Sequence, residues 1–485
     1  NVLKRDIEDQ INTYFKTSLA YVGVVLPLNE EEKRKWIKEQ LESDKEDQEL
    51  LAAKVRTSPL EAPSYSNLVN PKSPDKYKFP KCRKTKLENG LTVLSYRRTK
   101  LPKVSVYLRL KADKCYDSEQ LPGLYNFVSK LLLEGTENMP RLELVDQIEK
   151  RGVSLRISPI GEIVFDCLPT DLEFMLGLIT DLINSPKFDS QAIEKIRQKV
   201  LVSIKSFEDD TISTAKNLLL SKVYDNHPYG RFELGSEESL NKITQQDIID
   251  FHKKYFSADG AHCAIVGDFT KKQLDKALAN TLEKIRSTPV ETKSLPKIER
   301  TAAEACSKYM NRDQVALGFA GLTVKSNDPD FFPLLVFNEV FSSGMSSYMF
   351  KLRQTTGLFY YYCSNLLLSA YLHPGNAFVL AIVSPDNEAA AEQEIRKLID
   401  TSADLVTQEE IDQATNGLIY RLPRIYETNN AIAETFVNLA GLRFPANYYE
   451  KAPEKLLAIS LEQVRAAVKQ YFNTSKMHLA KVGRL

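Results

Sequence analysis

Two distant segments of the chain share one pattern of apolar and polar positions. Residues 243–269 align without a gap on residues 459–485, with Ile, Lys, Tyr-Phe, His, Ala, Val and Gly at matching places. Both segments have the pattern of an amphipathic helix followed by a strand, and Thr244 and Ser460 stand where helix N-caps are expected. A repeat of this kind predicts that the chain contains a duplicated domain.

A weaker third copy lies near the start of the sequence. Tyr14-Phe15-Lys16-Thr17-Ser18 is followed by the apolar run 19–26. In the other two copies this segment closes a domain, so residues 1–28 are predicted to be the last helix and strand of a preceding domain. The sequence would then be the back part of a longer protein. Residues 29–79 are predicted to be a linker, charged at helical spacing at first and rich in proline afterwards.

The remaining patterns predict an α+β fold. Asn89-Gly90 marks a turn between two strands. Helical and strand patterns then follow in blocks, without the regular β-α-β rhythm of a doubly wound fold. We expect two homologous domains, residues 80–290 and 297–485, each a mainly antiparallel sheet packed against helices. The helical patterns cover residues 121–134, 141–151, 170–184, 190–223, 328–341, 345–355, 388–400 and 407–440.

Composition excludes several classes of protein. The 485 residues are 43% apolar and 27% charged, as in an ordinary globular protein, and 65 Lys and Arg balance 64 Asp and Glu. This balance indicates no nucleic-acid partner. The six cysteines form no C-x-x-C pair, which argues against a zinc knuckle or a redox motif. No apolar run approaches the roughly 18 residues of a transmembrane segment.

Residues 123–140 carry a specific resemblance. Their frame, G-L-x-x-F-x-x-x-L-L-x-E-G-T-x-x-x-P, resembles the insulinase, pitrilysin and mitochondrial processing peptidase family of zinc metallopeptidases. The resemblance implies a helix with the motif H-x-x-E-H, in which two His bind zinc and the Glu activates a water. Here the matching positions hold Asn126, Ser129 and Lys130, and the third ligand, a Glu on a later helix, falls near Ser203. We therefore expect no metal on this chain, and zinc on a missing N-terminal half or a partner.

A second resemblance concerns substrate binding. Leu352-Arg353 and Tyr360 match the form L-R-x-x-x-x-L-x-Y, whose Arg and Tyr reach the substrate backbone near the zinc in larger members of the family. Tyr348 stands where many two-domain members have Arg. A guanidinium and a phenol can both donate hydrogen bonds to a peptide carbonyl. The residues alone also allow a surface ion pair for Arg353 and an ordinary strand position for Tyr360.

The resemblance implies the C-terminal, non-metal-binding half of a zinc metalloendopeptidase that degrades or processes peptides in a closed chamber. This half would contribute substrate binding, and its partners would be an N-terminal half or an active peptidase subunit, together with peptide substrates. One alternative is a separate inactive subunit that pairs with an active one. Another is a structural core-type subunit without a proteolytic role. The sequence leaves the substrate and the compartment open.

Overall fold

The computed structural model describes residues 3–15, 21, 23, 29–53 and 79–484. The chain divides into two compact units, Asn1–Asn70 and Pro71–Leu485. None of the described helices is long and apolar enough to cross a membrane.

The first unit contains the helices α1 (Lys4–Tyr14) and α2 (Glu30–Ala53). The N–H of Phe15 donates to the carbonyl of Ile11 where α1 ends. The helices of the other two copies also end at a Tyr-Phe pair. In each of them the N–H of that Phe donates to the carbonyl four residues earlier. Most of the strand expected over residues 19–26, and the proline-rich part of the predicted linker, lie outside the described residues.

The second unit contains two sheets, and the predicted α+β class is confirmed. Residues 83–285, the first half, form a six-stranded sheet of order β1-β2-β6-β3-β5-β4, and residues 305–483, the second half, a five-stranded sheet of order β7-β11-β8-β10-β9. Only β2/β6 and β7/β11 pair in parallel among the described strands. The strands are β1 Arg83–Lys86, β2 Thr92–Arg97, β3 Val104–Arg109, β4 Arg156–Ile157, β5 Glu162–Cys167, β6 His262–Gly267, β7 Ala305–Tyr309, β8 Val315–Leu322, β9 Phe359–Leu368, β10 Asn376–Val383 and β11 His478–Gly483.

The repeated segments form the same helix and strand in each half, α9 (Gln245–Tyr255) with β6 and α17 (Leu461–Tyr471) with β11. Thr244 and Ser460 cap the two helices, as predicted. Each strand ends in a glycine with φ near +150°, Gly267 and Gly483. A Cβ on Gly267 would lie 2.2 Å from the carbonyl oxygen of Lys103, and one on Gly483 2.4 Å from that of Gln314. Close approach of the neighbouring strand therefore requires glycine at both ends.

Two of the predicted helices are divided in the structure. The pattern 190–223 forms α6 (Ser190–Glu208) and α7 (Thr211–Tyr224), because the Asp210 carboxylate accepts from the N–H of Ser213 and starts a new helix. The pattern 407–440 forms α14 (Gln408–Arg421) and α15 (Asn429–Gly441), separated by a 3-10 turn that contains Pro423. The other α-helices described are α3 Leu124–Leu131, α4 Arg141–Glu149, α5 Leu172–Asn184, α8 Glu237–Lys242, α10 Lys271–Asn280, α11 Phe331–Ser342, α12 Tyr348–Thr356, α13 Glu388–Leu405 and α16 Ala452–Leu457.

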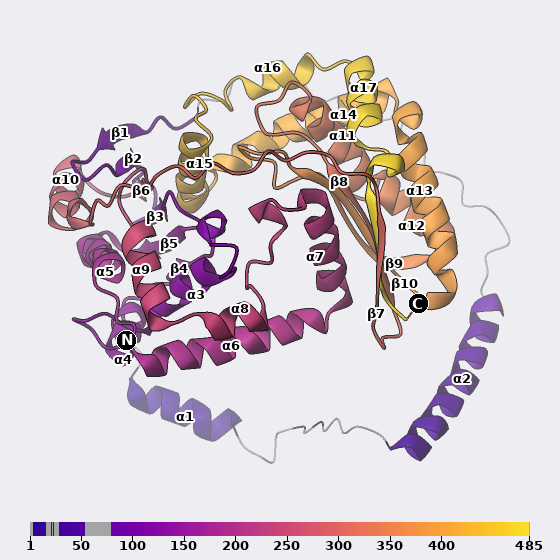
Figure 1. The fold of residues 1–485 in the computed structure, drawn as a ribbon, viewed down its shortest axis with the longest axis horizontal. Helices are drawn as coiled ribbons and strands as arrows, with labels where there is room; N and C mark the ends of the chain where they lie inside the picture. The colour runs from indigo at the N-terminus through magenta and orange to yellow at the C-terminus, as the bar shows by residue number, and fades with distance from the viewer. Residues whose placement is uncertain (1–2, 16–20, 22, 24–28, 54–78, 485) are drawn as a thin grey trace. The chain divides into compact units, whose positions relative to one another are not determined.

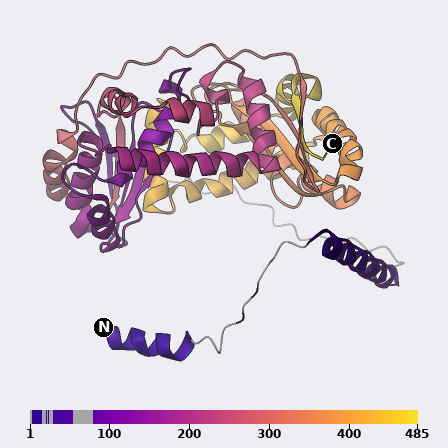
Figure 2. The same ribbon diagram turned by 60° about the horizontal axis from the view of Figure 1, so that its bottom comes forward.

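Each half lends a helix to the sheet of the other half. Leu219 and Val223 of α7 pack against the sheet of the second half, and Phe436 and Val437 of α15 pack against that of the first. Figure 1 shows α7 beside β8 and α15 beside β6. An irregular segment, residues 286–304, connects the halves along the chain (Figure 2). This exchange joins the halves through two buried apolar faces, and the domain boundaries at 290 and 297 stay a prediction.

Candidate functional site

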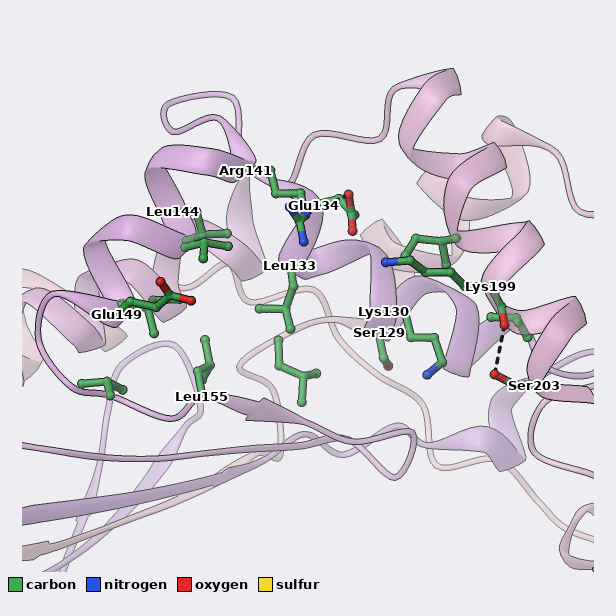
Figure 3. A pocket seen from close by; sticks show the side chains of 16 residues that line it. Ser129, Lys130, Leu133, Glu134, Arg141, Leu144, Glu149, Leu155, Lys199 and Ser203 are labelled. Atoms are coloured by element: carbon green, nitrogen blue, oxygen red, sulfur yellow. Dashed lines mark hydrogen bonds and ion pairs between the residues drawn. The ribbon is translucent and has the colours of Figure 1, made fainter. Parts of the chain in front are cut away.

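A cleft of about 530 Å³ lies between α3, α4, α6 and the segment that leads into β4. Ser129 and Lys130 of α3 and Ser203 of α6 line this cleft together (Figure 3). The structure therefore brings together three of the four positions that the resemblance assigns to the metal ligands and the base. The fourth, Asn126, is only 4% exposed and is not among the residues that line the cleft.

The polar groups of these positions do not fit a zinc ion. The hydroxyl of Ser129 donates to the carbonyl of Tyr125 at 2.8 Å, and the hydroxyl of Ser203 donates to the carbonyl of Lys199 at 3.0 Å. Lys130 places a cation where the resemblance implies a neutral imidazole ligand. In the described part of the chain, no three His, Cys, Asp or Glu side chains are grouped so that they could hold a metal ion.

The rest of the cleft combines an apolar lining with charges. Glu134 forms ion pairs with Arg141 at 3.3 Å and Lys195 at 2.6 Å. Lys199 also lines the cleft, and Glu149 lies at the opposite end from the lysines (Figure 3). Sequence reasoning missed Lys199, although it stands four residues before Ser203 and therefore on the same helix face. The apolar lining consists of Leu133, Leu144, Val145, Ile148, Val153, Leu155, Ile157, Ile196 and Val200.

Arg353 and Tyr360 lie against each other beside the junction of α12 and β9. Gly357, with φ of +64°, ends α12 and lets the chain turn back into β9. The guanidinium carbon of Arg353 then lies 5.4 Å from the centre of the Tyr360 ring, within cation–π range. Tyr360 is 84% exposed, and neither residue lines the cleft described above. Their roles in substrate binding stay a prediction.

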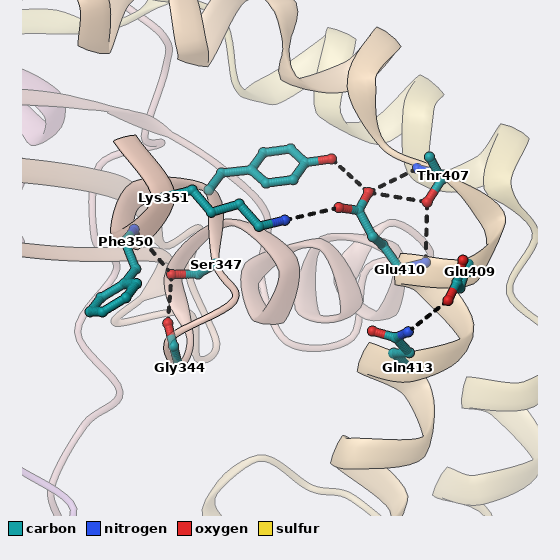
Figure 4. A network of polar contacts seen from close by, with 9 residues as sticks. Gly344, Ser347, Phe350, Lys351, Thr407, Glu409, Glu410 and Gln413 are labelled. Carbon is teal, nitrogen blue, oxygen red and sulfur yellow. Dashed lines mark hydrogen bonds and ion pairs between the residues drawn. The ribbon is translucent and has the colours of Figure 1, made fainter. Parts of the chain in front are cut away.

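Tyr348, at the position where many two-domain members have Arg, has a local structural partner. Its phenol donates to the carboxylate of Glu410 at 2.7 Å, which also accepts from the N–H of Thr407 and lies 3.7 Å from the ammonium of Lys351 (Figure 4). Burial and the neighbouring carboxylate raise the pKa of Tyr348. This network ties α12, which carries Arg353, to the start of α14.

Two family models match the second compact unit. The model described as "Insulinase (Peptidase family M16)" matches residues 92–236, and the "Peptidase M16 inactive domain" matches residues 242–418. The chain belongs to the insulinase family. The resemblance inferred from residues 123–140 is thus confirmed.

Relatives and solved structures extend this likeness over most of this chain. The "Non-peptidase homolog YmxG" of Helicobacter pylori is 24% identical over 394 residues, which cover 79% of this chain and 89% of the relative. A peptidase M16 inactive domain from Pseudomonas fluorescens superposes with a TM-score of 0.77 at 19% identity, covering 83% of this chain and 98% of that structure. The periplasmic protease PqqL of Escherichia coli gives a TM-score of 0.67 at 14% identity, covering 85% of this chain and 48% of that structure. The comparisons support an inactive M16-like protein.

Proposed function

We propose that this chain is the non-metal-binding half of a zinc metalloendopeptidase, and that the zinc is held by another half. One observation carries the proposal. Ser129, Lys130 and Ser203, the residues that the resemblance matches to two ligands and the base, line one cleft between α3 and α6. A lysine ammonium repels Zn²⁺, and serine hydroxyls that donate to backbone carbonyls are poor substitutes for the carboxylates of a base and a ligand.

The comparisons support this proposal in two ways. The model that matches residues 242–418 describes an inactive domain, and the Helicobacter relative is named a non-peptidase homolog. The fold covers 48% of the PqqL structure, so a protein of that size has room for a second, zinc-bearing half. Two such halves would enclose peptides in a chamber, and Arg353 and Tyr360 would donate to the substrate backbone.

The zinc-bearing half is either part of the same polypeptide or a separate subunit. The ending of α1 at Tyr14 and Phe15, which has the same hydrogen bond as the ends of α9 and α17, favours a further copy of the repeat on the same polypeptide. In both arrangements this half contributes chamber wall and substrate contacts.

The test compares the isolated chain with the same chain combined with the zinc-bearing half, whether that half belongs to the same polypeptide or is a separate subunit. Alone, it should carry no stoichiometric zinc by elemental analysis and should not hydrolyse an unstructured fluorogenic peptide. Replacing Asn126 and Lys130 with His should not restore hydrolysis, because a ligand and the general base would still be missing. Turnover should rise only when the zinc-bearing half is added.

Two results would contradict the proposal. One is a tightly bound zinc per isolated chain that is lost in Lys130→Ala. The other is a zinc-bearing half whose turnover does not change when this chain is added, which would favour a structural role without proteolysis.

A further inference from the structure

The cleft contains two ammonium groups that have no partner among the described residues. Lys130 of α3 and Lys199 of α6 both extend into it, and neither forms an ion pair with any residue in the described part of the chain (Figure 3). The nearby carboxylate of Glu134 is already paired with Arg141 and Lys195. This end of the cleft therefore has an excess of positive charge and attracts an anion.

The remainder of the cleft restricts what that anion can be. Its lining is mostly aliphatic, with Leu133, Ile148 and Leu155 among the contributors. A small inorganic anion would leave this apolar surface exposed to water, whereas an acid joined to apolar groups would cover it. Glu149 lies at the far end, away from the two lysines, and repels a second acid there.

We propose that this cleft binds the free carboxyl terminus of a peptide whose last side chains are apolar. The terminal carboxylate pairs with Lys130 and Lys199, and the last side chains cover the aliphatic lining. The assignment rests on the proposed function, since it requires that peptides reach this half.

A peptide fits the cleft better than a fatty acid because of Glu149. A backbone N–H or a basic side chain of the preceding residues can donate to the Glu149 carboxylate. The hydrocarbon end of a fatty acid offers no donor to this exposed carboxylate and therefore gains no hydrogen bond there.

The test measures binding to the whole chain by fluorescence anisotropy. The probe is an unstructured peptide with an N-terminal fluorescein and the C-terminal sequence Ala-Leu-Val, made once with a free carboxylate and once as the amide. The free acid should bind at least ~10-fold more tightly than the amide, the scale of one charge-assisted hydrogen bond or more. Added salt should reduce this preference.

Three variants make the test specific to the cleft. Lys130→Gln combined with Lys199→Gln should abolish the preference for the acid. Lys205→Gln removes one positive charge from the same helix at an exposed position outside the cleft, and it should leave the preference unchanged. Ile148→Ser should weaken acid and amide alike, because it alters only the apolar lining. Far-UV circular dichroism checks that each variant is folded.

Equal affinity for the acid and the amide would overturn the proposal. So would a Lys205→Gln variant that loses the preference for the acid as completely as the double variant does. If dodecanoate displaces the peptide and binds more tightly than the peptide, the cleft is a fatty-acid site. That result would overturn the assignment of a peptide. Because this assay uses the isolated chain, its failure leaves the assay with the zinc-bearing half unaffected. Conversely, an acid preference in a chain that does not activate a zinc-bearing half would overturn only the proposed function.

Discussion

A buried histidine beside a half-buried one, at the junction of the two halves, should make the stability of the protein depend on pH. His227, in the first half, is 2% exposed, and its ring centre lies 5.3 Å from that of His373 in the second half. Its Nδ1 accepts from the N–H of Tyr229 at 3.1 Å. Burial, His373 and the positive charge of Arg231 together lower the pKa of His227 to about 4.

The sign and the size of the effect follow from this pKa. The unfolded chain binds a proton on this histidine near pH 6.5, whereas the folded chain binds it near pH 4. The contribution of His227 to the free energy of unfolding is therefore fully present above pH 6.5 and is lost as the pH falls towards 4. The difference between the pKa values of the unfolded and folded chain corresponds to about 3 kcal/mol of stability in full, of which about 2 kcal/mol is lost between pH 7 and pH 5. Acidification should therefore weaken the junction between the halves.

The assay compares the free energy of unfolding at pH 7 and pH 5 in the wild type and in His227→Asn. Asparagine can still accept from the N–H of Tyr229 at this helix-capping position but does not titrate. Since four other histidines also have lowered pKa values, the difference between variant and wild type isolates His227. The free energy of unfolding should fall by about 2 kcal/mol less from pH 7 to pH 5 in this variant than in the wild type. Leu219→Ala shortens a buried side chain and changes no titratable group, so its free energy of unfolding should fall as much as that of the wild type. An equal drop in His227→Asn and wild type would refute the reasoning.

Two further predictions concern the repeat and the proposed substrate contacts. Gly267→Ala should destabilise the protein by at least about 2 kcal/mol in chemical denaturation, because its Cβ would meet the Lys103 carbonyl, whereas Gly417→Ala, in α14 with open space around it, should be neutral or slightly stabilising. A similar loss in both variants would contradict the role given to the close strand contact. With the zinc-bearing half present, Arg353→Ala or Tyr360→Phe should lower kcat/KM about 10–1000-fold on an unstructured peptide, with little change in the melting temperature. Unchanged turnover in both variants, or a loss that parallels unfolding, would return these two residues to purely structural roles.

The sequence alone was sufficient for most of the local structure and for the family. Helix caps such as Thr244 and Ser460, the turn at Asn89-Gly90 and the helix that carries Ser129 and Lys130 depend on contacts between residues a few positions apart. Such contacts leave a fixed spacing in the sequence. The break between α6 and α7 also had a local signal, the capping Asp210, but an apolar spacing that continued across it predicted one helix.

Only the tertiary structure decided which distant elements meet. The insertion of β6 between β2 and β3, the exchange of α7 and α15 between the halves, and the contact of His227 with His373 join residues far apart in the chain. The same is true of the cleft that places Lys199 beside Lys130. An apolar helix face has the same sequence pattern whichever sheet it covers, because the hydrophobic effect is non-directional. Which sheet such a helix covers depends on complementary shape and on burial in the assembled fold. The spacing of residues in the sequence does not contain that information.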